Sequence, residues 1–502
     1  MNKNVVIIGA GLGGLFTGAI LAKEGLHVTL LEKNATIGGG LQTFKRFGEV
    51  FDTGMHIVGG LNKGGNIRRI CDYLGISAGI RLKKVDADCS DRLYFAEDRT
   101  YYTIANGREG FVSSLAESFP EERENLTRYV DALYCMTDKV DQFNLRPSTG
   151  QMSLFAGSND FLLSANEFIA KYVSNEKLQS ILAYMNPLYG GVKDKTPAYV
   201  HAIISTLYIN GTSRFVGGSS HLADLLAKVV TDHGGEVLTN NGVEWIEVQE
   251  RMVQHVRTVK GDIFTADYYI SDIHPCTMFQ IMDEKALPKA YTQRLNSIVN
   301  ATSAFSLYLK LKENSFPYIN HTEFYMTRYA DVWNFSRADK PWPLGFLFMT
   351  PPEENQGAYS RKALVTSPMP WSMVRQWEHT TVGHRGTDYE RWKAERAEEL
   401  LAQIEDIHPG FRQCIEKMET SSPLTIRDFY GVKEGSLYGF SKDCTNIALT
   451  QVPVITKIRN LLLTGQNINL HGICGVPLTS ISTCEAILGI NYVLNRINEC
   501  SD

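Results

Sequence analysis

Residues 4–32 read NVVIIGAGLGGLFTGAILAKEGLHVTLLE, and this stretch decides the fold of the chain. Residues 5–8 are a continuous apolar run rich in β-branched side chains, which predicts a buried strand. The turn GAGLGG over 9–14 follows, then a helical segment that stops at Gly25 and a second apolar strand over 27–31 that ends on Glu32. This order of strand, glycine turn, helix, strand and acid predicts a dinucleotide-binding βαβ unit.

Each residue type in this unit has a physical role. Gly9 makes the tight turn, Gly11 lets the backbone approach a pyrophosphate, and Gly14 lets the helix lie close to the sheet. Free N–H groups and the dipole at the helix start favour the negative phosphates. Glu32 is placed to accept hydrogen bonds from a ribose 2′-OH, and its charge would repel a 2′-phosphate. A glycine-rich surface turn beside a solvated acid is the alternative, which the two strands and the spaced acid disfavour.

Composition limits the classes of protein that the chain can belong to. Its 502 residues predict two or three lobes, and 43% hydrophobic residues is typical of a soluble globular protein. We expect no transmembrane span, no signal peptide and no metal site. A net charge of −5 argues against nucleic acid as a partner, and nine irregularly spaced cysteines without a CxxC predict free thiols in a reducing cytoplasm.

A second glycine-rich stretch follows the βαβ unit. Glycines at 38–40, 54, 59 and 60 indicate a backbone that lies against something flat or phosphorylated. A glycine-rich hairpin without a ligand is the alternative interpretation.

These residues carry a family resemblance. GGGLQTF over 38–44 and FDTGMHIVGG over 51–60 resemble the flavoprotein superfamily of amine oxidases and phytoene desaturases, and most closely its retinol saturase and carotenoid isomerase branch. The resemblance covers the first 60 residues, a middle block over 214–248 and the last 45 residues. The chain departs from the pattern at Gly40, where many relatives have an arginine.

The resemblance implies an α/β fold, α+β as a whole. A Rossmann-like FAD-binding domain of the glutathione-reductase type would be interleaved with a substrate domain of mixed sheet and helices. Residues 1–65, 212–275 and 426–502 would form the FAD-binding domain, and 66–211 and 276–425 the substrate domain with a helical lobe.

The resemblance also implies the cofactor contacts. Val243 would pack near the adenine, and the polar residues after Gly465 would hold the ribitol–phosphate part. The helix that follows 465–475 would direct its N-terminus at the flavin pyrimidine ring, where reduced flavin carries negative charge. The predicted cofactor-binding residues are Gly9, Ala10, Gly11, Leu12, Gly13, Gly14, Glu32, Lys33, Gly39, Gly40, Leu41, Val243, Gly465, Gln466, Asn467, Gly475 and Val476.

The segments between these blocks are less specific. Residues 66–210 have a largely helical pattern, with Ser164 and Glu167 spaced as a capping box. The apolar stretch 152–165 fits a helix–helix contact, the mouth of an apolar tunnel or a peripheral membrane contact. Alternation over 303–312 predicts a half-buried strand, and Pro477 is expected in the first turn of the last cofactor helix. The aromatic-rich region 276–425 fits either a substrate lobe or an ordinary core.

Because no second GxGxxG occurs, we assign the N-terminal unit to FAD, and NAD(P)H would dock only transiently as an electron donor. Members of the resembled branch desaturate, saturate or isomerise apolar polyenes and isoprenoids through the flavin, so we expect such an apolar small molecule as substrate. His56 is the candidate catalytic acid or base, with a structural histidine as the alternative. Two other functions stay open: a flavin amine oxidase, and a non-catalytic prenyl-binding protein of the same fold. We expect a protein of the cytoplasm, with or without membrane association. The sequence leaves the direction of its reaction and its oligomeric state open.

Overall fold

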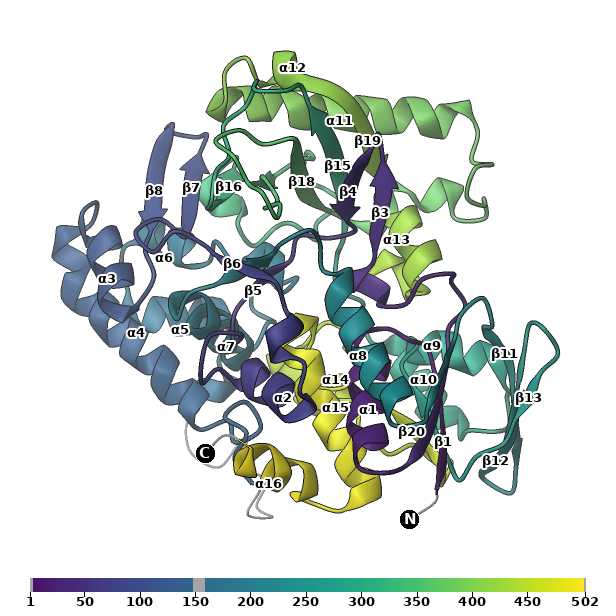
Figure 1. Cartoon of the computed structure of the whole chain (residues 1–502). Coiled ribbons are helices and arrows are strands. Elements are labelled where there is room, and N and C mark those ends of the chain that lie inside the picture. Colours follow the sequence, from purple (N-terminus) through teal and green to yellow (C-terminus); the bar gives the residue numbers. More distant parts are fainter. Residues whose placement is uncertain (1–2, 148–158, 501–502) are drawn as a thin grey trace.

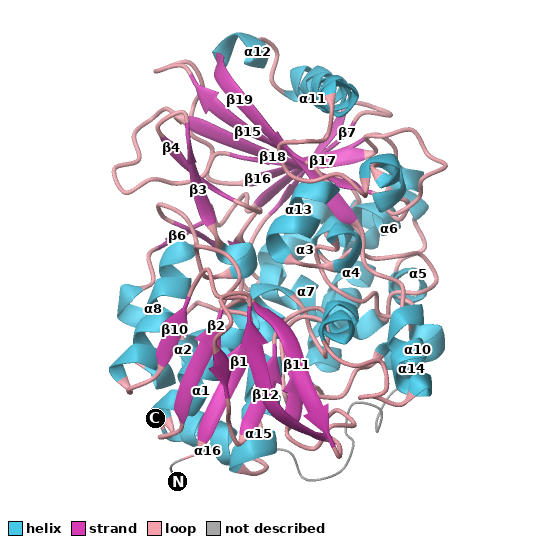
Figure 2. Cartoon of the chain, turned by 90° about the vertical axis from the view of Figure 1, so that its right-hand side faces the viewer, coloured by secondary structure: helices cyan, strands magenta, loops and turns pink. Residues whose placement is uncertain are grey.

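The computed structural model describes residues 3–147 and 159–500, and the first half of the apolar stretch 152–165, residues 152–158, lies outside them. The predicted α/β class with a mixed sheet is confirmed. Two large sheets lie at opposite ends of the molecule, as both views show (Figure 1 and Figure 2). The predicted division into domains stays a prediction.

The first large sheet has five parallel strands drawn from three distant parts of the chain. Their order is β10 (Glu236–Leu238), β2 (His27–Leu31), β1 (Asn4–Ile8), β14 (Tyr268–Ser271) and β20 (Leu461–Leu463). The strands that begin the chain are buried over all but their first residue, because helices cover the sheet. Helix α1 (Leu12–Lys23) packs between α8 (Ser220–Asp232) and α15 (Gly472–Leu488). The N-terminal unit is therefore completed by residues hundreds of positions away.

The second large sheet has seven strands and is mixed. Its order is β19 (Ile415–Ser421), β15 (Ser303–Leu311), β18 (Lys362–Met369), β17 (Gly345–Met349), β16 (Thr322–Met326), β7 (Asp91–Phe95) and β8 (Thr100–Ile104). The long helix α11 (Thr387–Ile407) lies along this sheet at the top of Figure 1. Leu307 and Leu309 of β15 pack in the core cluster that includes Leu400 of this helix.

Two sequence predictions about local structure are wrong, and a third is incomplete. The segment 66–210 contains the predicted helices, but 91–104 forms a hairpin that joins the seven-stranded sheet. Strand β15 is buried on both faces rather than half-buried, since α11 covers one face and Phe51 contacts Tyr308 on the other. Pro477 is the sixth residue of α15 and not part of its first turn.

The described residues also form three smaller sheets. They are the hairpin β3 (Thr43–Arg46) and β4 (Glu49–Asp52), the set β5 (Ile57–Val58), β9 (Ser213–Phe215) and β6 (Leu82–Lys84), and the antiparallel β11 (Val243–Gln249), β12 (Met252–Thr258) and β13 (Ile263–Phe264). Strand β5 follows the predicted FDTG segment directly and pairs with β9. The glycine-rich stretch is thereby held between the two ends of the molecule.

A helical lobe lies beside the five-stranded sheet, with α7 packed against α4 and α5. The remaining helices are α2 (Asn66–Leu74), α3 (Arg108–Ala116), α4 (Arg123–Asp138), α5 (Ala165–Tyr172), α6 (Glu176–Leu182), α7 (Ala198–Ile209), α9 (Pro275–Met278), α10 (Lys289–Ser297), α12 (Phe411–Cys414), α13 (Pro423–Tyr430), α14 (Ile447–Thr450) and α16 (Tyr492–Glu499). The predicted capping box is confirmed, with Ser164 and Glu167 bonded reciprocally at the start of α5. Among the described residues no single helix is long and apolar enough to cross a membrane; α15 and α16 reach that length only as a pair bent by 118°.

Candidate cofactor and substrate site

One cavity of about 420 Å³ lies between the two large sheets. The ends of β1, β2 and β14 open into one part of it, and residues of β15, β17 and β18 line another part. In open parallel sheets, ligands bind at the carboxyl ends of the strands. The predicted dinucleotide unit therefore opens into the same space as the seven-stranded sheet.

Most predicted site residues line this cavity, including His56, Glu32, Val243 and the loop residues 39–41 and 465–467. Ala10, Gly14 and Gly475 do not. Ala10 is buried and donates its N–H to Glu32 Oε2 at 2.9 Å. A Cβ on Gly14 would lie 2.2 Å from the carbonyl oxygen of Gly9, and one on Gly475 2.6 Å from Leu470 Cβ. These two glycines permit close backbone packing and do not face the ligand space.

Gly13 is the residue of the glycine turn that lies against the backbone of Gly465. A Cβ on Gly13 would lie 2.6 Å from the Cα of Gly465, whereas one on Gly11 would meet only the carboxyl of Asp272 within 3 Å. Gly465 itself has a φ of +87°, which favours glycine. The GAGLGG turn and the C-terminal TGQN segment thus need glycine on both sides of their contact.

Glu32 is held in place by the backbone. Its two carboxyl oxygens accept hydrogen bonds from Ala10 N and, at 2.8 Å, from Asn34 N. Its side chain is buried and borders the cavity. Each oxygen has a further lone pair, so the carboxylate can still accept a ribose hydroxyl.

Lys33 and Asn34 connect this end of the cavity to helix α13. Lys33 Nζ donates to the carbonyl of Asp428 and Asn34 Nδ2 to the carbonyl of Phe429, both at 2.9 Å. Burial lowers the pKa of Lys33. Tyr430 of the same helix lies 3.8 Å from the place that a Cβ on Gly40 would take. A tyrosine ring therefore lies next to the position at which many members of the resembled family have an arginine.

The C-terminal block provides the last part of the wall. Gln466, Asn467 and Val476 line the cavity, together with the first residues of α15. Asn467 Oδ1 is buried and has no hydrogen-bond partner in the described structure, so a donor on a ligand would satisfy it. A glycine cradle, a ribose-accepting acid and this free amide oxygen fit FAD.

His56 lines the cavity and lies beside a fixed carboxylate. His56 Nδ1 is 3.4 Å from Asp52 Oδ1, which also accepts from Ser219 Oγ at 2.6 Å and from Ser219 N at 2.8 Å. Burial alone would raise the pKa of Asp52, but the neighbouring imidazole and Ser219 outweigh it and lower the pKa. Asp52 is therefore ionised near neutral pH, and its charge faces His56 Nδ1 at 3.4 Å without a hydrogen bond in the described structure.

Sequence reasoning missed several polar residues of the wall, among them Asp272, His471 and Cys474. Burial, with a contribution from Lys442, lowers the pKa of His471 to about 3, so its imidazole is neutral. Cys474, one of the predicted free thiols, borders the cavity and donates to the carbonyl of Gly59 at 3.1 Å. The position of His471 directly before Gly472 and the last cofactor helix was the available signal.

The part of the cavity away from the glycine turn is apolar. Its wall comprises Met55, Ile57, Leu188, Ile204, Leu207, Leu347, Leu437 and Ile473. Among the described lining residues, the only carboxylates are Glu32 and Asp272, and both lie at the glycine turn. The apolar part therefore has no anionic partner for a charged amine.

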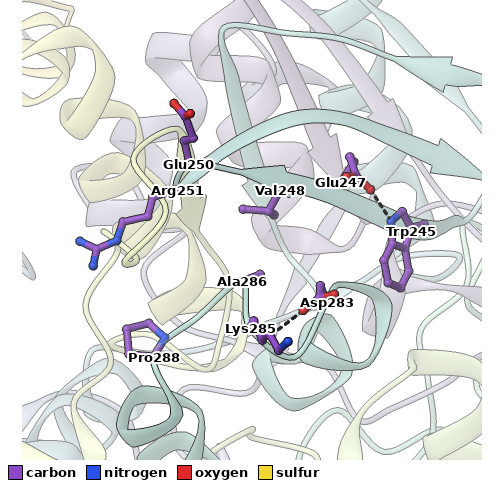
Figure 3. A pocket seen from close by; sticks show the side chains of 9 residues that line it. All are labelled: Trp245, Glu247, Val248, Glu250, Arg251, Asp283, Lys285, Ala286 and Pro288. Atoms are coloured by element: carbon purple, nitrogen blue, oxygen red, sulfur yellow. Dashed lines mark hydrogen bonds between the residues drawn. The ribbon is translucent and has the colours of Figure 1, made fainter.

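A separate hollow of about 480 Å³ lies outside this site. Figure 3 shows its wall, where Trp245 donates to Glu247 Oε2 at 3.0 Å and Arg251 lies on the opposite side. It has no lining residue in common with the cavity and no glycine turn. We therefore place the cofactor in the cavity between the sheets.

Comparisons with known proteins show the family and the fold. The model of the family described as flavin containing amine oxidoreductase matches residues 12–486. All-trans-retinol 13,14-reductase of Homo sapiens is 25% identical over 527 residues, covering 97% of this chain and 86% of the relative. The chloroplastic prolycopene isomerase of Daucus carota is 23% identical over 475 residues, covering 90% and 74%. A solved oxidoreductase from Methanosarcina mazei has the same fold, with a TM-score of 0.64 at 18% identity and coverage of 96% and 100%.

Proposed function

Because the chain belongs to the flavin-containing amine oxidoreductase family, we propose that it is an FAD-dependent oxidoreductase that acts on carbon–carbon bonds of an apolar polyene or isoprenoid. The family resemblance predicted from the sequence is thereby confirmed, and FAD is the cofactor. The observation that carries the choice of substrate is the apolar part of the cavity, which offers hydrocarbon contacts and no carboxylate. A polyene needs only such contacts, and the names of the retinol reductase and the prolycopene isomerase support the same class.

When bound, FAD supplies the hydride chemistry, and the protein positions and shields the reactants. The first residues of α15 line the cavity, and the N–H groups at this helix start would favour negative charge on the reduced cofactor. Leu347 of the seven-stranded sheet and Leu207 of α7 face the cavity from different elements and exclude water from the space between them.

His56 is the residue we assign to proton transfer. It lines the cavity, its Nδ1 lies 3.4 Å from the Asp52 carboxylate, and its Nε2 would exchange a proton with a substrate carbon. Saturation of a double bond needs such a proton donor, and desaturation needs an acceptor. The same residue suits either direction.

We also propose a cytoplasmic location and a transiently docking nicotinamide dinucleotide as electron donor. All nine cysteines are unpaired, which supports a reducing compartment. A purification under reducing and non-reducing conditions with the same flavin content would support this location.

The substrate proposal is tested by anaerobic incubation of the oxidised and the reduced protein with retinol, lycopene isomers and phytoene, followed by mass analysis of the products. A gain of two hydrogens, a loss of two, or a change of geometry at constant mass would each support a polyene reaction. Conversion of an aliphatic amine with release of peroxide, and of no polyene, would establish the amine oxidase alternative instead.

Ile204 tests whether the apolar part holds the hydrocarbon chain. It lines both the cavity and a small adjoining hollow of about 20 Å³ that Phe143 and Leu470 also border. We expect Ile204→Trp to lower turnover of a long polyene by about tenfold or more while FAD content stays at the wild-type level. Ile204→Val is the matched control and should retain turnover. Equal turnover of the tryptophan variant and wild type would place the substrate elsewhere.

A further inference from the structure

The side chain of Asp272 lies inside the glycine cradle. Asp272 directly follows β14, which pairs with β1 next to the GAGLGG turn. A Cβ on Gly13 or Gly465 would lie 2.4 or 2.3 Å from Asp272 Oδ1, and one on Gly11 2.6 Å from Oδ2. The carboxyl group therefore lies between the two glycine segments that approach each other at the start of α1.

This is also where a dinucleotide presents its diphosphate. The N-terminus of a helix after a glycine turn binds phosphate through backbone N–H groups. Here the N–H groups of Gly14 and Gly11 already act on the Asp272 carboxyl. A carboxylate at this place competes for the same donors and repels a diphosphate at short range.

Among the described residues, the charged group that acts on Asp272 is an anion rather than a compensating cation. Glu32, at the end of β2, is the charged group that acts on it, and its sign is the same. The adjoining parts of α1, β1 and the Gly465 segment carry no titratable side chain. His274, two residues further on, faces Asn300 Oδ1 at 3.0 Å, and burial lowers its pKa to about 4, so it is neutral.

We propose that Asp272 couples FAD binding to proton uptake. As a neutral acid it admits the diphosphate and donates a hydrogen bond to a phosphate oxygen, and as a carboxylate it opposes binding. Asp272 is thus a positioning residue for the cofactor that also makes flavin loading depend on pH.

The direction of the pH effect follows from linkage. Burial and Glu32 raise the pKa of Asp272 to about 7, against the opposing amides of Gly14 and Gly11. The negative diphosphate raises this pKa further in the complex, so the complex binds one more proton than the free protein above about pH 7. The FAD dissociation constant should therefore be constant below about pH 7 and rise by up to about tenfold per pH unit above it.

The test is a titration of flavin-free protein with FAD, followed by flavin fluorescence, between about pH 6 and about pH 9. Isothermal calorimetry in two buffers of different ionisation enthalpy gives the number of protons taken up, expected to approach one above about pH 7. In Asp272→Asn the amide replaces the neutral acid, so FAD should bind at high pH as tightly as wild type does at low pH. Asp267→Asn, an exposed position before the other end of β14, is the matched control and should keep the wild-type slope.

Two outcomes would overturn the proposal. One is a wild-type dissociation constant that does not change with pH, with no proton uptake in calorimetry. The other is an unchanged pH slope in Asp272→Asn, which would assign the titration to another group. The titration and the calorimetry of the wild-type protein do not depend on the variant, so they test the proposal even if Asp272→Asn does not fold.

Discussion

Replacing Gly13 with valine is expected to abolish FAD retention. The first side-chain carbon would lie 2.6 Å from the Cα and 2.8 Å from the N of Gly465, and both are backbone atoms that cannot turn aside. Separating these segments opens the cradle in which the diphosphate lies. The purified variant should be colourless, and its flavin absorbance relative to protein should be near zero even after incubation with excess FAD.

The matched control is Gly357→Val. No atom lies within 4 Å of a Cβ at Gly357, and its φ does not require glycine. This variant should retain wild-type flavin content and thermal stability. A Gly13→Val protein that is folded, judged by far-ultraviolet circular dichroism, and binds FAD normally would contradict the placement of the diphosphate.

Replacing His56 with alanine is expected to lower the turnover of a polyene by about a hundredfold to about ten-thousandfold, the usual contribution of a positioned acid or base. FAD content should not change, because the variant alters a side chain on the substrate-facing wall. The effect should be on kcat rather than on KM, because the side chain acts on the transferred proton and not on substrate binding.

Asp52→Asn separates proton transfer from simple packing. The amide keeps the size of the side chain but removes the negative charge beside His56 Nδ1, so an intermediate loss of turnover and a shifted pH profile are expected. His379→Ala is the control, since that imidazole is 93% exposed. A His56→Ala enzyme with wild-type kcat and pH profile would show that His56 is structural.

The N-terminal unit could be predicted from sequence because its signals are local. Strand hydrophobicity, glycine spacing and the acid at position 32 are set within one βαβ unit. The partner of Gly13 could not be derived in this way, because Gly465 lies 452 positions further along the chain and only folding brings the two together. The family resemblance predicted that the C-terminal block belongs to the cofactor site, but it did not predict that the backbone of Gly465 lies against Gly13.

Residues without a motif were the ones missed. Asp272 follows a strand with no distinguishing pattern, and its importance arises from the two glycine segments that surround it. The hairpin 91–104 was missed inside a region of helical character, although Tyr102 and Ile104 alternate with exposed residues as in a strand. Strand β15 was taken as half-buried because Ser, Tyr and Lys alternate with apolar residues, whereas the hydroxyl of Tyr308 is satisfied within the core by Thr53 and Ser421.

The most direct test of an FAD enzyme of apolar polyenes is a single turnover. The protein is reduced under anaerobic conditions, mixed with one equivalent of a polyene such as retinol, and its flavin absorbance is recorded together with the product mass. For a saturation, we predict that oxidised flavin reappears as the polyene gains two hydrogens. For an isomerisation, the polyene should change geometry only while the flavin is reduced. For a desaturation, a more saturated polyene should instead bleach the oxidised protein. A flavin that responds to no polyene in either redox state, but is reduced rapidly by an amine, would contradict this account.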